Sequence, residues 1–96
     1  MFEIELIEVG LVALRGRLDA VQANDAERFL DGIDSEFVID LSELEYISSA
    51  GLGVLLKTHK RLIPFSGGLK LIRVTSHIND IFKYSGFDKL FEIETS

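Results

Sequence analysis

Apolar and acidic side chains alternate at the start of the chain. Over residues 2–6, phenylalanine, isoleucine and leucine are separated by glutamates, which is the period of two expected of a strand with one buried face. After the Val9-Gly10 turn, the apolar run 11–14 is close enough in sequence to pair with this strand. The pattern therefore predicts an N-terminal β-hairpin.

Three later segments carry apolar residues at helical spacing, and each is bounded by capping or helix-ending residues. The segments are 24–33 with a capping box formed by Asn24 and Glu27, 52–63 ended by Pro64 and Gly67-Gly68, and 77–85 between a Ser76 cap and Gly86. We therefore expect three short helices.

Further apolar runs lie between and after these helices. Residues 37–39 are apolar without alternation, which predicts a central strand, buried on both faces and ending at Asp40-Leu41. Runs at 69–74 and 91–94 predict two more strands. The expected order is β-β-α-β-α-β-α-β, a single α/β domain over residues 1–96 with a mixed sheet covered by helices.

Composition agrees with one self-sufficient domain. The 96 residues are 47% hydrophobic and include no cysteine, so a core can form without disulfides and the chain suits a reducing compartment. The formal net charge of −6 disfavours nucleic acid and anionic lipid as partners. The N-terminus lacks a secretion signal and no apolar run could cross a bilayer, so we expect no membrane insertion and a cytoplasmic location.

Charge is unevenly divided along the chain. Residues 1–48 carry a net charge of −9 and residues 49–96 a net charge of +3. Because we expect the two halves to interleave in one sheet, this asymmetry need not become a separation of charge in space.

The stretch from Asp40 to Gly53 is the most informative about chemistry. A strand ending in aspartate, followed by a loop and the sequence Ser-Ser-Ala-Gly-Leu-Gly, places two hydroxyls at a helix start on the carboxyl edge of the sheet. A phosphate on Ser48 or Ser49 would be stabilised there by free main-chain N–H groups and the helix dipole. The alternative is that one serine only caps the helix.

The same residues resemble the STAS domain family, specifically the stand-alone anti-sigma factor antagonists. The resemblance rests on Asp40-Leu41-Ser42, on Ser48 to Gly53 after Ile47, on Gly16-Arg17-Leu18-Asp19, and on the segment 82–87. It covers essentially the whole chain in the right order.

This resemblance implies a partner switch. The unmodified domain would bind an anti-sigma factor that is also a serine kinase, and phosphorylation of one serine would release it, with a serine phosphatase restoring the hydroxyl. The implied phosphorylation site is Ser49, with Ser48 as second choice because the family often has aspartate there. The implied partner-binding residues are Asp19, Asp40, Ser48, Ser49, Gly51, Leu52 and Gly53.

Each of these roles has a simpler alternative. Asp19 and Asp40 could each serve only as turn or helix caps. The whole domain could be a non-phosphorylated STAS docking subunit of a transporter or signalling assembly. Because Gly51 and Gly53 are read as places for close approach, we expect Gly51→Val to hinder partner docking more than folding.

Enzymatic readings find little support in the sequence. The Gly-x-Ser-x-Gly nucleophile pattern and the Gly-Lys-Ser/Thr ending of a phosphate-binding loop are both absent. His59 and His77 have no metal-ligand spacing and are expected to be packed or solvent-facing side chains. We therefore expect a binding protein without catalytic activity, cofactor or metal.

Overall fold

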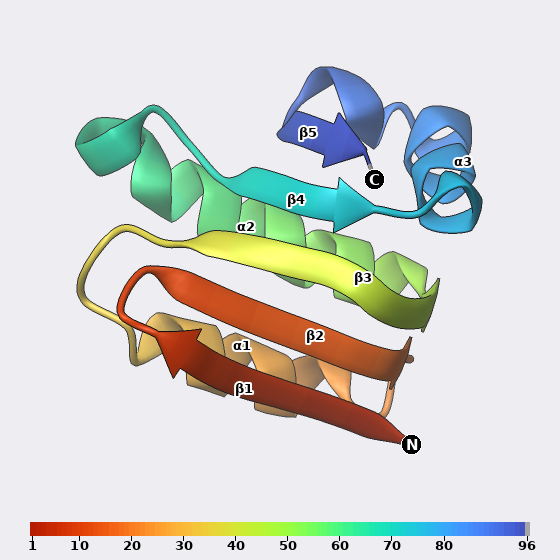
Figure 1. Ribbon diagram of the computed structural model, residues 1–96, viewed down its shortest axis with the longest axis horizontal. Coiled ribbons are helices and arrows are strands. Elements are labelled where there is room, and N and C mark those ends of the chain that lie inside the picture. Colours follow the sequence, from red (N-terminus) through yellow and green to blue (C-terminus); the bar gives the residue numbers. More distant parts are fainter. Residues whose placement is uncertain (96) are drawn as a thin grey trace.

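One five-stranded sheet organises the molecule. The computed structural model describes residues 1–95, and its strands lie side by side in chain order (Figure 1). β1 is antiparallel to β2, and the three remaining pairings are parallel, so the expected mixed sheet is confirmed. The strands are β1 (Phe2–Glu8), β2 (Leu11–Leu18), β3 (Val38–Ile47), β4 (Lys70–Val74) and β5 (Glu92–Thr95).

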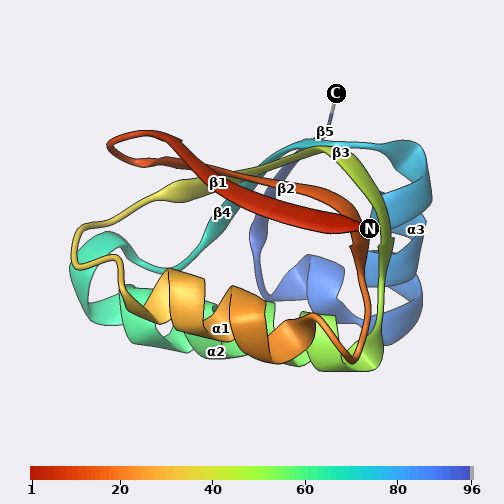
Figure 2. The same cartoon turned by 90° about the horizontal axis from the view of Figure 1, so that it is seen from below.

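The helices leave one face of the sheet open. They are α1 (Ala23–Asp31), α2 (Ser49–Ser66), α3 (Ser76–Ser85) and the short 3-10 helix η1 (Phe87–Lys89). Figure 2 shows α1 and α2 together under one face, with α3 standing at the end of the sheet. The core lies between these layers, where Leu14 and Leu41 of the strands and Leu55 and Phe82 of the helices are fully buried. We call the other, helix-free side the open face.

β3 continues well beyond the predicted end at Asp40-Leu41 and reaches Ile47. Its pairing with β2 shifts register twice, between Ala13 and Arg15 and again between Gly16 and Arg17. Each shift inserts an extra residue into β3 as a β-bulge, which breaks the period of two and bends the strand. The buried residues are consequently spaced irregularly, so this half of the strand has the sequence pattern of a loop.

Three predicted helix boundaries are also corrected. Gln22, and not Asn24, precedes α1, and it makes no side-chain cap. Thr75 caps α3, accepting a hydrogen bond from the Ile78 N–H, so Ser76 is already helical. Pro64 lies inside the last turns of α2, and the helix ends only at Gly67, in a left-handed conformation. A proline removes one helical hydrogen bond but has a helical φ, so this final stretch continues past it.

The strands of the two charged halves do not interleave in the sheet, contrary to expectation. Because the strand order follows the chain order, β1, β2, β3 and α1 keep the acidic residues 1–48 on one side, whereas β4, α3 and β5 are added beyond β3. α2 is the exception, because it packs against α1, where Lys57 pairs with Glu27 and Arg61 with Asp31. The asymmetry of −9 against +3 therefore becomes only a partial separation in space, with β1 at the acidic border.

Candidate functional site

The start of α2 lies where β2 and β3 end together. Leu18 and Ile47 are paired in the ladder, and the next N–H, that of Ser48, donates to the Leu18 carbonyl at 2.9 Å. Ser48 has extended backbone angles, and its Oγ accepts a hydrogen bond from the Gly51 N–H at 3.1 Å. Ser48 is therefore the N-cap of α2, as one of the two sequence-based alternatives required.

Ser49 is the first helical residue, and its side chain is exposed. Its hydroxyl makes no hydrogen bond with any residue in the range 1–95, and the main-chain N–H groups of Ser49 and Ala50 also have no acceptor there. The first charged side chain along α2 is Lys57. The helix start thus offers a free hydroxyl beside two free N–H donors at the positive end of the helix dipole.

Asp19 borders this site from the loop after β2. Its Oδ1 accepts hydrogen bonds from the N–H groups of Val21 and Gln22, both at 3.1 Å. The predicted turn-capping role of Asp19 is confirmed, because these bonds hold its half-buried carboxylate in place next to the strand end that leads into Ser48. The neighbouring Val21 is 81% exposed.

The two motif glycines have different environments. A Cβ atom on Gly51 would lie 2.8 Å from Leu18 Cγ and 2.9 Å from Ile47 Cγ1, whereas a Cβ on Gly53 would meet nothing within 4 Å. Gly51 therefore brings α2 close against the ends of β2 and β3, so Gly51→Val must disturb folding, and the expectation that it hinders docking more than folding stays a prediction. Leu52 is also buried, so within the motif it is Ser49, Ala50 and Gly53 that are exposed.

Asp40 is not part of this site. It is opposite Ala13 in the ladder, five residues before the Leu18 end of β2, which corresponds to about 16 Å along a strand. Its Oδ1 accepts from the Ser42 N–H at 2.8 Å, and its Oδ2 accepts from Arg73 Nη1 at 3.3 Å. Asp40 therefore accepts a main-chain N–H at the β-bulge within β3, where a cap at a strand end or turn was expected, and the long β3 is what separates Asp40 from Ser49.

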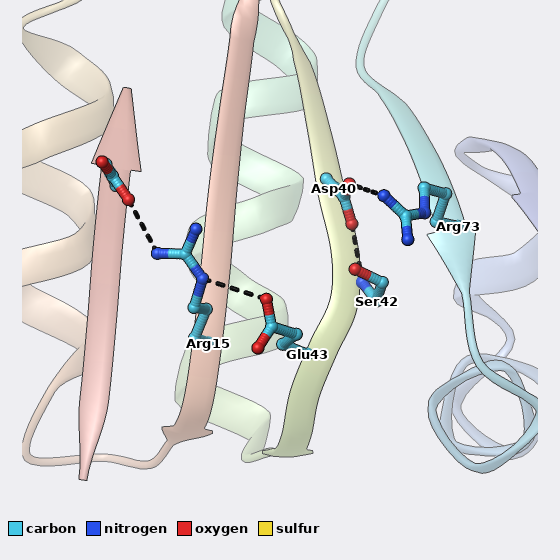
Figure 3. A network of polar contacts seen from close by, with 6 residues as sticks. Arg15, Asp40, Ser42, Glu43 and Arg73 are labelled. Atoms are coloured by element: carbon cyan, nitrogen blue, oxygen red, sulfur yellow. Dashed lines mark hydrogen bonds and ion pairs between the residues drawn. The ribbon is translucent and has the colours of Figure 1, made fainter. Parts of the chain in front are cut away.

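Asp40 belongs instead to a group of charged residues on the open face, shown in Figure 3. Arg15 on β2 donates to Glu5 on β1 at 2.8 Å and to Glu43 on β3 at 3.2 Å. Hydrogen bonds to Glu5, and then to Glu43, raise the pKa of Arg15. We call this group the open-face cluster; its members are Glu5, Arg15, Asp40, Ser42, Glu43 and Arg73.

The open-face cluster was not predicted from the sequence, because its members come from four strands and β-bulges set the register between β2 and β3. Arg73 is a second unexpected feature: its φ of 53° makes it the only non-glycine residue with positive φ among residues 1–95. The sequence did contain a signal for the cluster. Charged residues recur at every second position in 3–5, 15–17 and 43–45, and such residues face the same side of neighbouring strands.

The two histidines lie in different environments. His59 Nδ1 accepts from the Leu69 N–H at 2.9 Å, and its ring packs edge-on against Phe91. His59 lies midway along α2, as predicted, and His77 is exposed, as expected of a solvent-facing side chain. Over residues 1–95 no three His, Cys, Asp or Glu side chains gather so that they could hold a metal ion, and none of the helices there has the length and apolar character to cross a bilayer.

Comparisons with known proteins agree on one family. A family model described as Mlab, STAS domain matches residues 6–92. BtrV of Bordetella bronchiseptica, named as an anti-sigma factor antagonist, is 34% identical over 90 residues, covering 90% of this chain and 78% of that protein. The chain belongs to the STAS domain family.

Solved structures point to the same class. An anti-sigma factor antagonist from Mycobacterium paratuberculosis superimposes with a TM-score of 0.81 at 26% identity, over 100% of this chain and 86% of that one. The anti-sigma factor antagonist SpoIIAA in its unphosphorylated form gives 0.74 at 18% identity, over 100% and 89%, a likeness of fold. The predicted fold and family are both confirmed.

Proposed function

We propose that this STAS domain is an anti-sigma factor antagonist whose binding is controlled by phosphorylation of Ser49. In the unmodified state it binds an anti-sigma factor that carries serine kinase activity, and the phosphorylated state releases that partner. A serine phosphatase would return the domain to its binding form. In this proposal the domain acts by binding, in the cytoplasm, and catalyses no reaction itself.

The observation that carries this proposal is that the two serine hydroxyls differ in their hydrogen bonding. The Ser48 hydroxyl is occupied by the Gly51 N–H, whereas the exposed Ser49 hydroxyl has no partner among residues 1–95. A kinase could therefore modify Ser49 without removing the cap of α2. BtrV and the mycobacterial structure, both named as anti-sigma factor antagonists, support the class, and SpoIIAA, which has this fold, has been solved in a phosphorylated form as well.

The charge environment explains how a phosphate would act as a switch. Phosphorylation adds about −1.5 to −2 charges. The free N–H groups of Ser49 and Ala50 would stabilise the new group locally, so the domain stays folded. On α2 no cation precedes Lys57, and the fixed Asp19 carboxylate adds negative charge beside the site, so neither element neutralises the phosphate. A partner surface fitted to a neutral hydroxyl would then be repelled.

The proposed partner surface follows from the same geometry. We assign direct contacts to Asp19, Ser48, Ser49 and Gly53, which surround the start of α2, and to the exposed Val21 beside them. Gly51 and Leu52 would act from beneath by fixing the position of the helix. Asp40 would contact the partner only if the partner also reached the open face.

Peptide mapping by mass spectrometry tests the phosphorylation step. The wild type, Ser49→Ala and Ser48→Asn are incubated with Mg-ATP and lysate of the native cell, alongside a control substrate known to be phosphorylated by that lysate. Asparagine can still accept the Gly51 hydrogen bond, so Ser48→Asn removes the hydroxyl while keeping the cap. We expect one phosphate in the wild type and in Ser48→Asn, and none in Ser49→Ala.

Binding to the purified anti-sigma factor of the same organism tests the consequence. Ser49→Asp should bind at least about tenfold more weakly than Ser49→Ala, a difference of ~1.4 kcal/mol. Equal binding by the two variants contradicts the switch. If, in addition, peptide mapping finds no phosphate on the wild type, the domain is a constitutive docking subunit.

A further inference from the structure

The outer edge of β1 carries a row of unused main-chain hydrogen-bonding groups. β1 is the terminal strand of the sheet formed by residues 1–95. The Arg17 N–H donates to the Met1 carbonyl at 2.8 Å, and Phe2 is opposite Gly16. Because bonded and non-bonded pairs alternate in an antiparallel ladder, the N–H and C=O groups of Phe2, Ile4 and Leu6 point away from β2. These groups are the template that an added strand requires.

The side chains of β1 define what such a strand would carry. Phe2 and Ile4 pack against the core on the helix side, and Leu6, in the same row, is 46% exposed. Glu3 and Glu5 alternate with them and lie on the open face. An added strand would therefore place apolar residues beside Leu6 and place its other residues beside the two glutamates, since side chains directly across a ladder approach to about 5 Å.

Charge selects the type of partner. The sheet order places the acidic half of the chain at this border. Within residues 1–95, Glu5 is paired with Arg15, but Glu3 and Glu8 form no ion pair. The segment Phe2–Glu8 contains no lysine, arginine or proline, and its protection as an exposed edge comes from three glutamates and the register shift between Leu6 and Glu8. The glutamates leave a basic strand as the one whose charge complements this edge. Pairing with a second copy of β1 would bring the two glutamate rows together, so self-association is disfavoured.

We propose that β1 binds an extended segment of a partner protein in which basic residues alternate with apolar ones, by adding it to the sheet as a sixth strand. This surface is at the opposite border of the sheet from β5 and uses neither Ser48 nor Ser49. The domain could therefore engage such a segment whichever state the α2 start is in.

Titration of the isotope-labelled protein with a short synthetic peptide of alternating lysine and valine tests the proposal by NMR. The amide signals of Phe2, Ile4 and Leu6 should shift, and their hydrogen exchange should slow in the complex. A peptide of alternating glutamate and valine is the matched control and should leave these signals unchanged.

Two variants separate strand addition from general electrostatic attraction. Leu6→Pro removes one outward N–H without removing a bond to β2, and it should weaken binding about tenfold relative to Leu6→Ala, which retains that N–H. Glu3→Lys should weaken binding as well, with spectra elsewhere in the domain confirming that each variant is folded.

Equal affinity of Leu6→Pro and Leu6→Ala, or shifts spread over all acidic residues, would overturn the proposal in favour of diffuse charge attraction. Sedimentation of the free wild type as a dimer that Leu6→Pro dissociates would also overturn it, because the edge would then be occupied by a second copy.

Discussion

Polar groups are bonded to one another in the open-face cluster, whereas several at the start of α2 have no hydrogen-bond partner within the described residues. In the open-face cluster, Arg15 is shared by two glutamates, and Asp40 bonds to both Ser42 and Arg73. At the start of α2, the Ser48 hydroxyl completes the cap, but the Ser49 hydroxyl and the adjoining N–H groups have no partner among residues 1–95.

This difference separates polar groups that stabilise the domain from polar groups that are available for binding or modification. A group already bonded inside the domain must give up that bond before it binds anything else, and leaving a part-buried group unsatisfied costs about 1–3 kcal/mol. Ser49 carries no such cost. Residue type alone does not distinguish these cases, since Asp19 and Asp40 are both aspartates whose carboxylates accept a main-chain N–H two residues along the chain.

The largest expected effect concerns the glycines beneath and on the α2 start. Gly51→Ala should lower the free energy of unfolding by about 1–3 kcal/mol, because its Cβ would overlap Leu18 and Ile47. Gly53→Ala is the matched control and should raise stability by up to about 1 kcal/mol, because alanine favours a helix and the site is open. Urea unfolding measures both; equal effects would mean that Gly51 is not a packing position.

A smaller loss of stability is expected for a substitution in the open-face cluster. Asp40→Ala should lower the free energy of unfolding by about 1–2 kcal/mol, because the part-buried Ser42 N–H loses its acceptor. Asp40→Asn keeps an acceptor for Ser42 and should lose less. If Asp40→Ala unfolds at the wild-type urea concentration, the cluster contributes nothing to stability and Asp40 must be considered for binding instead.

The two serines should differ in stability by a modest amount. Ser48→Ala removes the cap of α2 and should lower the free energy of unfolding by about 1 kcal/mol. Ser49→Ala should change it by no more than about 0.5 kcal/mol, because an exposed hydroxyl without partners is lost. Thermal unfolding of the two variants checks this, and a greater loss in Ser49→Ala would reverse the assignment of cap and free hydroxyl.

The smallest effect concerns an exposed ion pair outside both regions. A hydrogen bond to Glu27 raises the pKa of Lys57 above its ordinary value of 10.5. Since the charged lysine is favoured in the folded state, this contribution is present at neutral pH and is lost as pH rises past 10.5 and through the raised pKa. The stability difference between wild type and Lys57→Gln should therefore narrow in alkaline solution; a difference independent of pH would contradict this.

Much of the fold was predictable from local patterns. Alternation over residues 2–6, glycine at the ends of α2 and α3, and apolar residues at helical spacing identified the order of elements, because each signal depends on near neighbours in the chain. The second half of β3 was not predicted, since two β-bulges displace its buried residues from a period of two. For this reason the strand was predicted to end at Asp40-Leu41, whereas β3 ends at Ile47.

For the candidate site, the sequence by itself determined that two adjacent serines stand at the start of a helix, after a strand, beside small residues. Only the tertiary structure decided which serine caps the helix and which has a free hydroxyl. Whether Ser48 or Ser49 caps α2 depends on where the helix begins relative to the ends of β2 and β3, and Gly51 sets that position by its contact with Leu18 and Ile47. The tertiary structure also kept the strands of the acidic half on one side of the sheet, because strand order is a property of long-range pairing that no local pattern encodes.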